Sequence, residues 1–279
     1  MHESHLLLSA RTWAYAGADE DGDDPAEAYH EAAKLYPVYG GTQTPGVYAL
    51  SVSRELRSLV ARSVRRGRQF PRIALPALEL PPLALGEAVR RRRSVRAFSG
   101  APLALSELGA LLRTAYGVTH RFTSESGESG AFRAVPSAGA LYPLELYALV
   151  RSVDGLAAGL YHYDPLDDVI EVLPQAVGLD DLRAAIPWPE IEPALQGAAL
   201  ALIVAGMFWR NRFKYGQRGY RFVLLEAGHA AQNAMLAATA LELGSVPVGG
   251  FYDAPLDHAL GFDGLNEGAL YAILLGRLP

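Results

Sequence analysis

The chain has 279 residues, of which 50% are hydrophobic and 20% are charged, and its formal net charge is −5. This composition is typical of a globular protein with a sizeable core, and the acidic balance gives no reason to expect a nucleic-acid partner. Because the chain contains no cysteine, disulfides, thiolate metal sites, iron–sulfur clusters and cysteine nucleophiles are excluded.

The first 82 residues differ in composition from the rest of the chain. An acidic run at 18–24 predicts a polar surface segment. Helices are expected at 29–36 and at 52–66, the latter from the spacing of its apolar residues. Prolines punctuate 70–82, which predicts an extended strap. We therefore expect an N-terminal extension over 1–82, for docking of a peptide or partner, and a main domain over 83–279.

Two stretches bear on localisation. The N-terminal residues MHESHLLLSARTW have a short apolar run without a basic region before it, which argues against a signal peptide. The most apolar long stretch, 222–243, contains Glu226, His229 and Asn233. Such polar residues are typical of a buried helix and not of a membrane span. The expectation is a cytoplasmic protein without membrane association.

Strands and helices are interleaved in the main domain without strict βαβ alternation, which predicts an α+β fold. The continuous apolar run at 198–206 predicts a central strand covered on both faces, and the polar stretch 119–132 predicts a loop. Helices are expected at 85–93, at 106–117 with Ser106 as N-cap, at 220–243 ending at Gly244, and at 254–260. Strands are expected at 144–151, 159–163, 169–173, 198–206, 246–251 and 269–275.

Common enzyme signatures are absent. In His30–Lys34 (HEAAK), Lys34 stands where the zinc-binding H-E-x-x-H motif needs its second histidine. The histidines are scattered along the chain, so no metal site is expected. There is no P-loop, no G-x-G-x-x-G after a strand and no G-x-S-x-G elbow. ATP binding, Rossmann-type nicotinamide binding and serine-hydrolase chemistry therefore lack support.

The densest charge in the chain is the run Arg90–Arg96 (RRRRSVR). Arginines that end a helix complement its dipole and can simply be solvated. The same residues, with Ser94 among them, can also clamp a phosphate, because guanidinium groups bind phosphate bidentately. In an acidic protein, this second interpretation indicates one small anionic ligand.

The helix expected at 220–243 carries Glu226, His229 and Asn233 within about a 60° arc. A stripe of this kind can face solvent. Apolar residues flank it closely, however, which favours a buried stripe that contacts a second subunit or a ligand.

Two other stretches are candidates for a site. Lys214-Tyr215 lies between a strand and the long helix, on an expected loop. The pair is either ordinary surface or, in a pocket, able to move protons. The small residues of 136–140 and the pair Gly249-Gly250 permit a ligand to approach the backbone closely.

Taken in order, these stretches resemble the FMN-dependent nitroreductase-like superfamily, and within it the SagB/ThcOx-type azoline dehydrogenases. Residues 92–96 (RRSVR) match the R-R-S-x-R element that opens the nitroreductase domain. Residues 136–145 (PSAGALYPLE) match the signature of the SagB type. Residues 226–233 (EAGHAAQN) and 246–251 fit the long helix and the flavin-facing strand end. The similarity extends over 83–278.

The resemblance implies a nitroreductase-like mixed sheet flanked by helices, in an intertwined homodimer with FMN at the subunit interface. The implied binders of the FMN phosphate and ribityl chain are Arg92, Arg93, Ser94 and Arg96, with Arg277 as a further candidate. The residues implied to contact the isoalloxazine are Pro136, Ser137, Ala138 and Ala140, with Gly249 and Gly250 near N5. General nitroreductases have asparagine in place of Ala140, and this departure is itself typical of the SagB type. Lys214 and Tyr215 match the catalytic Lys-Tyr pair of azoline oxidases.

These implications predict an FMN-dependent dehydrogenase that converts thiazoline or oxazoline rings of a ribosomally made peptide into thiazoles or oxazoles. A hydride leaves for the flavin and a ring proton goes to Lys214 or Tyr215, while oxygen is expected to reoxidise the flavin. The expected partners are a second copy of the chain, the azoline-containing peptide and a cyclodehydratase. Two alternatives are a general NAD(P)H-dependent nitroreductase or quinone reductase, and a non-catalytic flavoprotein subunit of a peptide-modifying complex.

Overall fold

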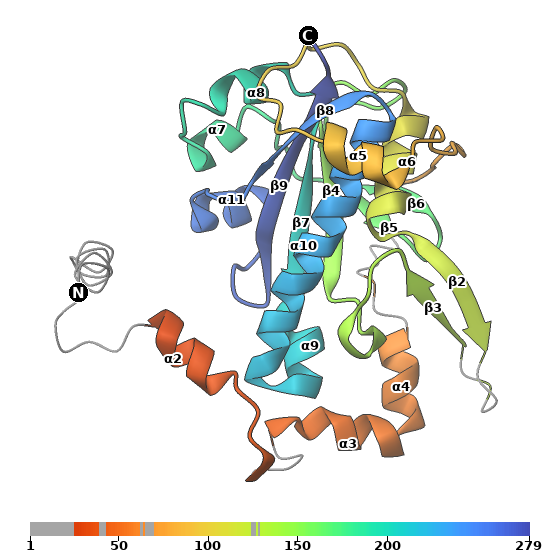
Figure 1. Ribbon diagram of the computed structural model, residues 1–279, viewed down its shortest axis with the longest axis vertical. Coiled ribbons are helices and arrows are strands. Elements are labelled where there is room, and N and C mark those ends of the chain that lie inside the picture. Colours follow the sequence, from red (N-terminus) through yellow and green to blue (C-terminus); the bar gives the residue numbers. More distant parts are fainter. Residues whose placement is uncertain (1–24, 39–42, 62–63, 65–69, 124–126, 128) are drawn as a thin grey trace, which may run out of the picture.

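A seven-stranded sheet forms the middle of the molecule, with the strand order β1-β6-β5-β4-β7-β9-β8 (Figure 1). The computed structural model describes residues 25–38, 43–61, 64, 70–123, 127 and 129–279. The strands of the sheet are β1 (Arg72–Ala74), β4 (Leu144–Val150), β5 (Gly159–Asp164), β6 (Val169–Val172), β7 (Leu200–Met207), β8 (Leu243–Val248) and β9 (Glu267–Arg277). Neighbouring strands pair antiparallel, and parallel bridges join Ser94 to Ser245 and Leu103 to Val153.

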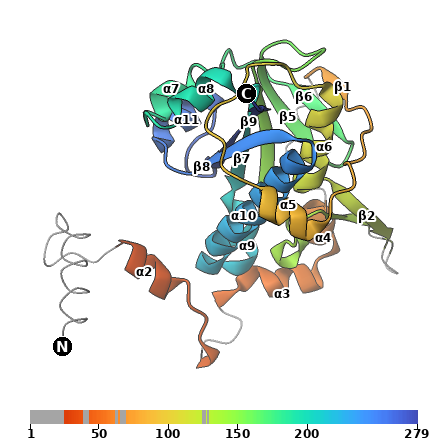
Figure 2. The ribbon, with the colours of Figure 1, turned by 45° about the horizontal axis from the view of Figure 1, so that its top comes forward.

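Helices cover both faces of this sheet, and α2, α3 and α4 lie below it (Figure 1). The helices are α2 (Pro25–Ala32), α3 (Pro45–Val52), α4 (Arg54–Ala61), α5 (Leu85–Arg91), α6 (Leu105–Tyr116), α7 (Leu182–Ala185), α8 (Glu192–Gly197), α9 (Phe208–Tyr215), α10 (Gln217–Ala240) and α11 (Asp253–Leu260). Figure 2 shows α6 and α10 on one face and α7, α8 and α11 on the other, and each layer closes a hydrophobic core against the sheet. The expected α+β fold is confirmed.

The central position of β7 explains the apolar run at 198–206. Leu202 and Val204 pack into the core under α6 and α10, whereas Ala201 and Ile203 pack into the core under α7, α8 and α11. Successive side chains of a strand point to opposite faces, so coverage of both faces requires every residue to be apolar. The prediction of a central, doubly covered strand is confirmed.

The prediction of a loop at 119–132 is wrong, because most of this stretch forms a β-hairpin. β2 (Val118–Thr123) and β3 (Ser129–Arg133) pair antiparallel in a separate two-stranded sheet. The rings of Phe122 and Phe132 stack across it with centroids 4.7 Å apart. A Cβ at Gly130 would lie 2.5 Å from the Phe122 ring. A glycine that resembles a loop signal thus makes room for a ring inside a strand.

The N-terminus of α6 differs from the expected one. The helix begins at Leu105 and its N-cap is Ala104, so Ser106 is not the cap. The Glu107 carboxylate accepts a hydrogen bond from the Ala104 amide at 2.8 Å, which is one half of a capping box. The expected end at Gly117 agrees with the structure, where Gly117 is the C-cap.

The end of α10 also differs from the expected one. The helix ends at Ala240, whereas Gly244, expected to end it, lies inside β8. A Cβ at Gly244 would lie 2.8 Å from the ring of Phe98. The turn between the elements instead uses Glu242, whose φ is 57°. Gly244 is therefore a packing glycine of the strand and not a helix cap.

Lys214 and Tyr215 lie on a helix, so the prediction that they belong to a loop is wrong. α9 follows β7 directly and ends at Gly216, whose φ of 56° breaks the helix. Glycine adopts such a φ at little cost. The long helix α10 then starts at Gln217. The two side chains are thus held by the last turn of a helix.

Among the described N-terminal residues, β1 joins the main sheet and α3 packs against α9. The helices expected at 29–36 and 52–66 are α2 and α4, both displaced or shorter, and the acidic run 18–24 lies outside the described residues. The strap expected at 70–82 contains β1, which pairs with β6. Within the described part of the chain, no helix is long and apolar enough to cross a membrane.

Gly46 on α3 lets the N-terminal part dock on α9. A Cβ there would lie 2.6 Å from the Cα of Lys214 and closer still to the carbonyl oxygen of Phe213. Both are backbone atoms that cannot rotate away. α3 and α9 therefore meet at backbone distance, a contact that the sequence did not indicate.

We expect Gly46→Val to release α3 from α9 and to destabilise this region by about 1–3 kcal/mol, because an overpacked contact between backbones has no room to relax. Hydrogen exchange of residues 45–61 should speed up. The matched control is Gly86→Ala on α5, where a Cβ meets nothing within 4 Å. Equal exchange in both variants would contradict the prediction.

Candidate functional site

The small-residue loop and the Lys-Tyr pair lie together. Gly139 has φ 64° and sits in a short 3-10 turn, Ala138–Ala140. A Cβ on Gly139 would lie 2.5 Å from the Tyr215 hydroxyl and closer still to Nζ of Lys214. Ala140 also has a positive φ, of 53°. Left-handed residues other than glycine are costly and cluster at functional sites, so the geometry marks this turn as a candidate site.

A buried chain of charges fixes α9 to the sheet. Arg210 of α9 pairs with Glu145 of β4, and its guanidinium also donates to the Tyr142 carbonyl at 3.3 Å. Glu145 in turn accepts from His162 Nε2 at 2.8 Å, and His162 Nδ1 lies 3.2 Å from Glu171. Breaking one member of such a buried network leaves uncompensated charge. Glu145, the last residue of the PSAGALYPLE stretch, thus helps to position the helix that carries Lys214.

The polar stripe of α10 is split by its surroundings. Glu226 is buried and accepts a hydrogen bond from the Tyr116 hydroxyl at 2.6 Å. Asn233 is half-buried and donates to the Ala134 carbonyl at 3.1 Å. His229 is exposed on the single chain, and its expected contact with a second subunit or a ligand stays a prediction. Asn233 lies about 20° from Glu226 around the helix and His229 about 60°, so only the first two reach the 133–137 segment.

Glu226 holds a proton beneath the loop near neutral pH. Burial raises its pKa from 4.5 to about 7, while Ser137, Tyr116 and Arg133 act in the opposite direction. Its Oε2 has no hydrogen-bond partner among the described residues. Ser137 Oγ accepts from the Tyr142 amide at 2.9 Å. This hydrogen bond fixes the hydroxyl of Ser137, a residue expected to contact the flavin ring.

We expect Glu226→Gln to stabilise the protein at pH 8 but not at pH 4. Because the pKa is raised in the folded state, from 4.5 to about 7, folding binds a proton between these values and stability falls as pH rises through them. The full cost above pH 7 is on the order of 3 kcal/mol. Denaturant unfolding of both proteins from pH 4 to 8 measures it, and parallel curves would contradict it.

His162 makes the folding stability of the natural chain and of Glu226→Gln fall with rising pH by the same amount. Burial lowers its pKa, but hydrogen bonds to Glu145 and Glu171 outweigh this effect and raise the pKa from 6.5 to about 9. The stability that protonated His162 contributes is complete below pH 6.5 and is lost as pH rises through 9. The difference between the two curves therefore isolates Glu226.

The residues expected to bind phosphate gather where α5 ends and β8 begins. Val95 donates to the Ser245 carbonyl at 2.9 Å, which holds this segment beside β8. The members of this group are Arg92, Arg93, Ser94 and Arg96. Within the described part of the chain, the three arginines form no ion pair. Arg93, Arg96 and Ser94 are exposed. The Arg93 guanidinium donates to the carbonyls of Arg90 and Arg92. Guanidinium groups without a carboxylate partner, gathered around a hydroxyl, suit a phosphate.

Arg277 and the glycine pair lie at opposite ends of β8, because Arg277 pairs with Leu243, its first residue, and Gly249 follows Val248, its last. The Arg277 guanidinium donates to Glu107 at 2.8 Å, so it reaches an anion only by giving up this pair. Gly249 and Gly250 directly follow β8, and the Trp188 indole donates to the Gly250 carbonyl. A Cβ at Gly249 would lie 3.3 Å from the Tyr271 ring.

A single chain does not bring the arginines and the Lys-Tyr pair together. Lys214 and Tyr215 precede the first turn of α10, whereas Arg91 lies 3.9 Å from Glu242, just beyond its last turn (Figure 1). The helix has 24 residues, which corresponds to about 36 Å. This span is longer than FMN. The candidate residues therefore form two half-sites at opposite ends of α10.

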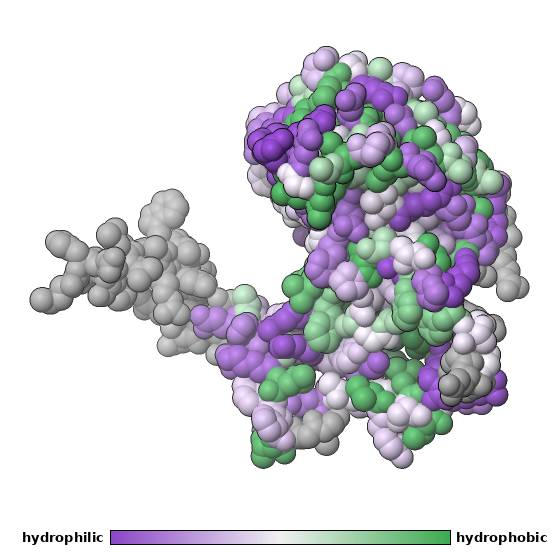
Figure 3. Space-filling view, turned by 45° about the vertical axis from the view of Figure 1, so that its right-hand side comes forward, coloured by the Kyte–Doolittle hydropathy of each residue, from purple (hydrophilic) through white to green (hydrophobic). Residues whose placement is uncertain are grey.

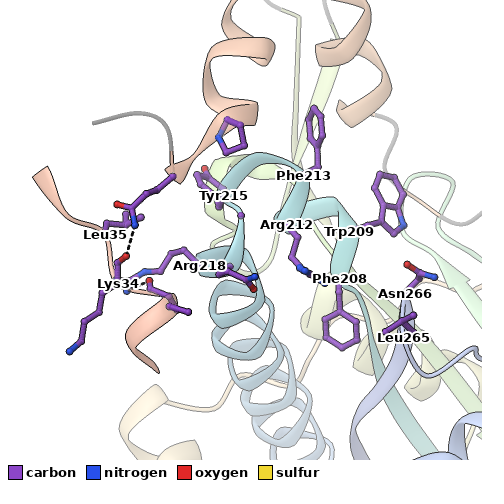
Figure 4. A pocket seen from close by; sticks show the side chains of 16 residues that line it. Lys34, Leu35, Phe208, Trp209, Arg212, Phe213, Tyr215, Arg218, Leu265 and Asn266 are labelled. Atoms are coloured by element: carbon purple, nitrogen blue, oxygen red, sulfur yellow. Dashed lines mark hydrogen bonds between the residues drawn. The ribbon is translucent and has the colours of Figure 1, made fainter. Parts of the chain in front are cut away.

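Two cavities flank α9. One, of about 410 Å³, borders Lys214. Its lining residues are Val47, Leu50, Ser51, Arg57, Val60, Phe122, Ser129, Gly130, Ala131, Gly139, Ala140, Tyr142 and Lys214. The other, of about 530 Å³, borders Tyr215, and Figure 4 shows it between α9 and the segment with Lys34 and Leu35. Sequence reasoning missed the contribution of α3 and α4, because their contact with α9 is nonlocal.

Comparison with known proteins bears on this site. The model of the Nitroreductase family matches residues 89–277. The provisionally named nitroreductase MJ1384 of Methanocaldococcus jannaschii is 41% identical over 65% of this chain and 85% of its own length. The Microcin B17-processing protein McbC of Escherichia coli is 32% identical over 47% of this chain. The Trifolitoxin-processing protein TfxB of Rhizobium leguminosarum is 30% identical over 52% of this chain. The matches span 49% of McbC and 39% of TfxB.

Solved structures share the fold. A provisionally named nitroreductase from Anabaena variabilis superposes with a TM-score of 0.70 and 28% identity, over 92% of this chain and 47% of its own. A chain of the E. coli microcin synthetase McbBCD complex with truncated pro-MccB17 bound has a TM-score of 0.57 and 20% identity, over 94% of this chain and all of its own.

Proposed function

The chain belongs to the nitroreductase family, and from this membership we propose that it is an FMN-dependent dehydrogenase that oxidises thiazoline or oxazoline rings in a ribosomally made peptide. The observation that carries the proposal is the contact of Lys214 and Tyr215 with Gly139 of the PSAGALYPLE stretch. The names of McbC and TfxB, both peptide-processing proteins, support a peptide as the substrate.

The described residues fit FMN as two half-sites. The exposed Arg93 and Arg96 and the partly exposed Arg92, with the Ser94 hydroxyl, suit the phosphate and ribityl chain. The side chains of Pro136–Ala140 are small, so a flat ring can approach this stretch closely. Because the arginines and the Lys-Tyr pair lie at opposite ends of α10, we propose a homodimer in which one copy supplies each half. Gly249 and Gly250 stay candidates for contacts to the flavin ring, and Arg277 stays a candidate for the phosphate.

When bound, FMN supplies the hydride acceptor. The azoline ring loses a hydride from one carbon and a proton from the adjacent atom, and the new double bond completes the aromatic azole. Lys214, as the neutral amine, or Tyr215, as the phenolate, would take the proton; Nζ of Lys214 lies 5.1 Å from the centre of the Tyr215 ring. α9, held by Arg210 and Glu145, keeps both groups beside the loop. Oxygen then accepts the electron pair and becomes hydrogen peroxide.

The test uses full-length protein loaded with FMN and an azoline-containing peptide in air. We expect a product lighter by two hydrogen atoms and one hydrogen peroxide for each ring oxidised. A peptide of unchanged mass, with flavin demonstrably bound, would reject the proposal. A cyclodehydratase that makes the azoline is the proposed partner, and supplying it with the unmodified peptide tests whether the two enzymes act in sequence.

The similarity to MJ1384, which extends over 85% of that protein, favours a second candidate. This is a general NAD(P)H-dependent nitroreductase or quinone reductase. Anaerobic mixing with NADH or NADPH separates the two, because rapid bleaching of the flavin absorbance supports the second candidate. Slow bleaching together with azoline oxidation supports the first.

A further inference from the structure

The cavity beside Lys214 has walls from parts of the chain that are far apart in sequence. α3 and α4 form one wall, the β2–β3 hairpin a second, and the loop with Gly139 and Ala140 the floor. Figure 3 shows hydrophobic side chains on the lower part of the molecule, where α3 and α4 lie, on a hollowed surface. The N-terminal part thus forms one wall of the cavity that borders Lys214, whereas Tyr215 borders the other cavity.

Most of this lining is apolar. Leu50 is 8% exposed, and Val47, Val60 and Phe122 present further apolar surface. The volume of about 410 Å³ lies near the lower end of the range for ligand pockets. Such a space suits one ring and its nearest neighbours, and it excludes a large side chain next to the ring.

Charge restricts the occupant further. Arg57 and Lys214 are the basic lining residues, and of these arginine is always a cation; no acidic residue lines the cavity within the described part of the chain. Arg57 donates to the Leu50 and Ser51 carbonyls at 2.8 and 3.0 Å, which keeps its charge in the wall. A basic side chain that enters this apolar space beside the Arg57 guanidinium is repelled.

We propose that α3, α4 and the β2–β3 hairpin form the pocket that selects the peptide segment around the ring, accepting an uncharged ring with small or acidic neighbours and rejecting a basic neighbour. The proposal rests on the proposed function. It assigns to the N-terminal helices the choice of substrate, in addition to any docking of a distant peptide segment.

The test compares Val47→Trp with Val52→Trp, both on α3. Val47 lines the cavity and is 44% exposed, whereas Val52 is 63% exposed and outside the lining. The FMN-loaded protein is given three azoline peptides with Gly, Glu or Lys beside the ring. For the natural chain we expect KM to be at least about 10-fold higher for the Lys peptide than for the Gly peptide. Val47→Trp should raise KM for the Gly peptide by a similar factor, with kcat, flavin spectrum and melting temperature unchanged.

Val52→Trp should leave all three KM values unchanged. Equal KM values for the two variants, or for the Lys and Gly peptides, would overturn the proposal. So would a change of oligomeric state in Val47→Trp alone, because it would assign the cavity to a subunit contact. If no peptide is oxidised, the proposed function fails; calorimetric binding of the same peptides then still tests the pocket, and loss of binding in Val47→Trp alone supports it.

Discussion

Substituting Lys214 by alanine is expected to slow azoline oxidation by about 10²–10⁴-fold, because the ring proton loses its acceptor. Tyr215→Phe, which removes only the hydroxyl near Gly139, should reduce kcat by a similar order. The double variant should oxidise the azoline only slightly more slowly than the less active of the two single variants. The effects of residues that act as a unit are not additive. Single-turnover bleaching of the flavin by the peptide measures the chemical step directly.

Flavin binding separates this result from a loss of folding. Both variants should keep the flavin spectrum and the melting temperature of the natural chain. Arg212→Ala, also on α9 and exposed, is the control and should keep full turnover. Unchanged turnover in Lys214→Ala and Tyr215→Phe would favour the alternative of a non-catalytic flavoprotein subunit.

Gly139→Ala should abolish most of the turnover and lower the stability only by the backbone cost of its positive φ. The new Cβ would overlap the ends of the Lys214 and Tyr215 side chains, which are flexible and can move away. The backbone cost of alanine at φ 64° is about 1–2 kcal/mol. The displaced pair, however, no longer meets the substrate in a productive geometry, and a shift of about 1 Å can cost 10²-fold in rate.

Gly155→Ala is the matched control for this effect. Gly155 has φ 80° and a Cβ there meets nothing within 4 Å, so the variant carries the same backbone cost without the overlap. Both variants should lose similar stability in denaturant unfolding, and only Gly139→Ala should lose turnover. Equal turnover in the two would show that the close approach at Gly139 has no catalytic consequence.

The spacing of apolar residues and the turn residues predicted helices and strands well where one face or both faces of the element are buried. The apolar run at 198–206 and the hairpin of β5 and β6 follow from strand periodicity and turn residues, and the structure confirms them. The same rules misplaced 119–132, Lys214-Tyr215 and Gly244. Gly130 and Gly244 are turn signals in the sequence, but each packs against an aromatic ring inside a strand. Lys214-Tyr215 was expected on a loop but forms the last turn of α9, which Gly216 ends.

The sequence by itself determined the α+β class, the central strand, and, through the resemblance carried by PSAGALYPLE and RRSVR, the family. Only the tertiary structure decided that Gly139 meets Lys214 and Tyr215, that α3 docks on α9 through Gly46, and that the arginines lie at the far end of α10. The physical reason is that periodicity and turn chemistry act over a few residues. Contacts between segments that are far apart in the chain depend on how whole layers pack, which no local pattern encodes.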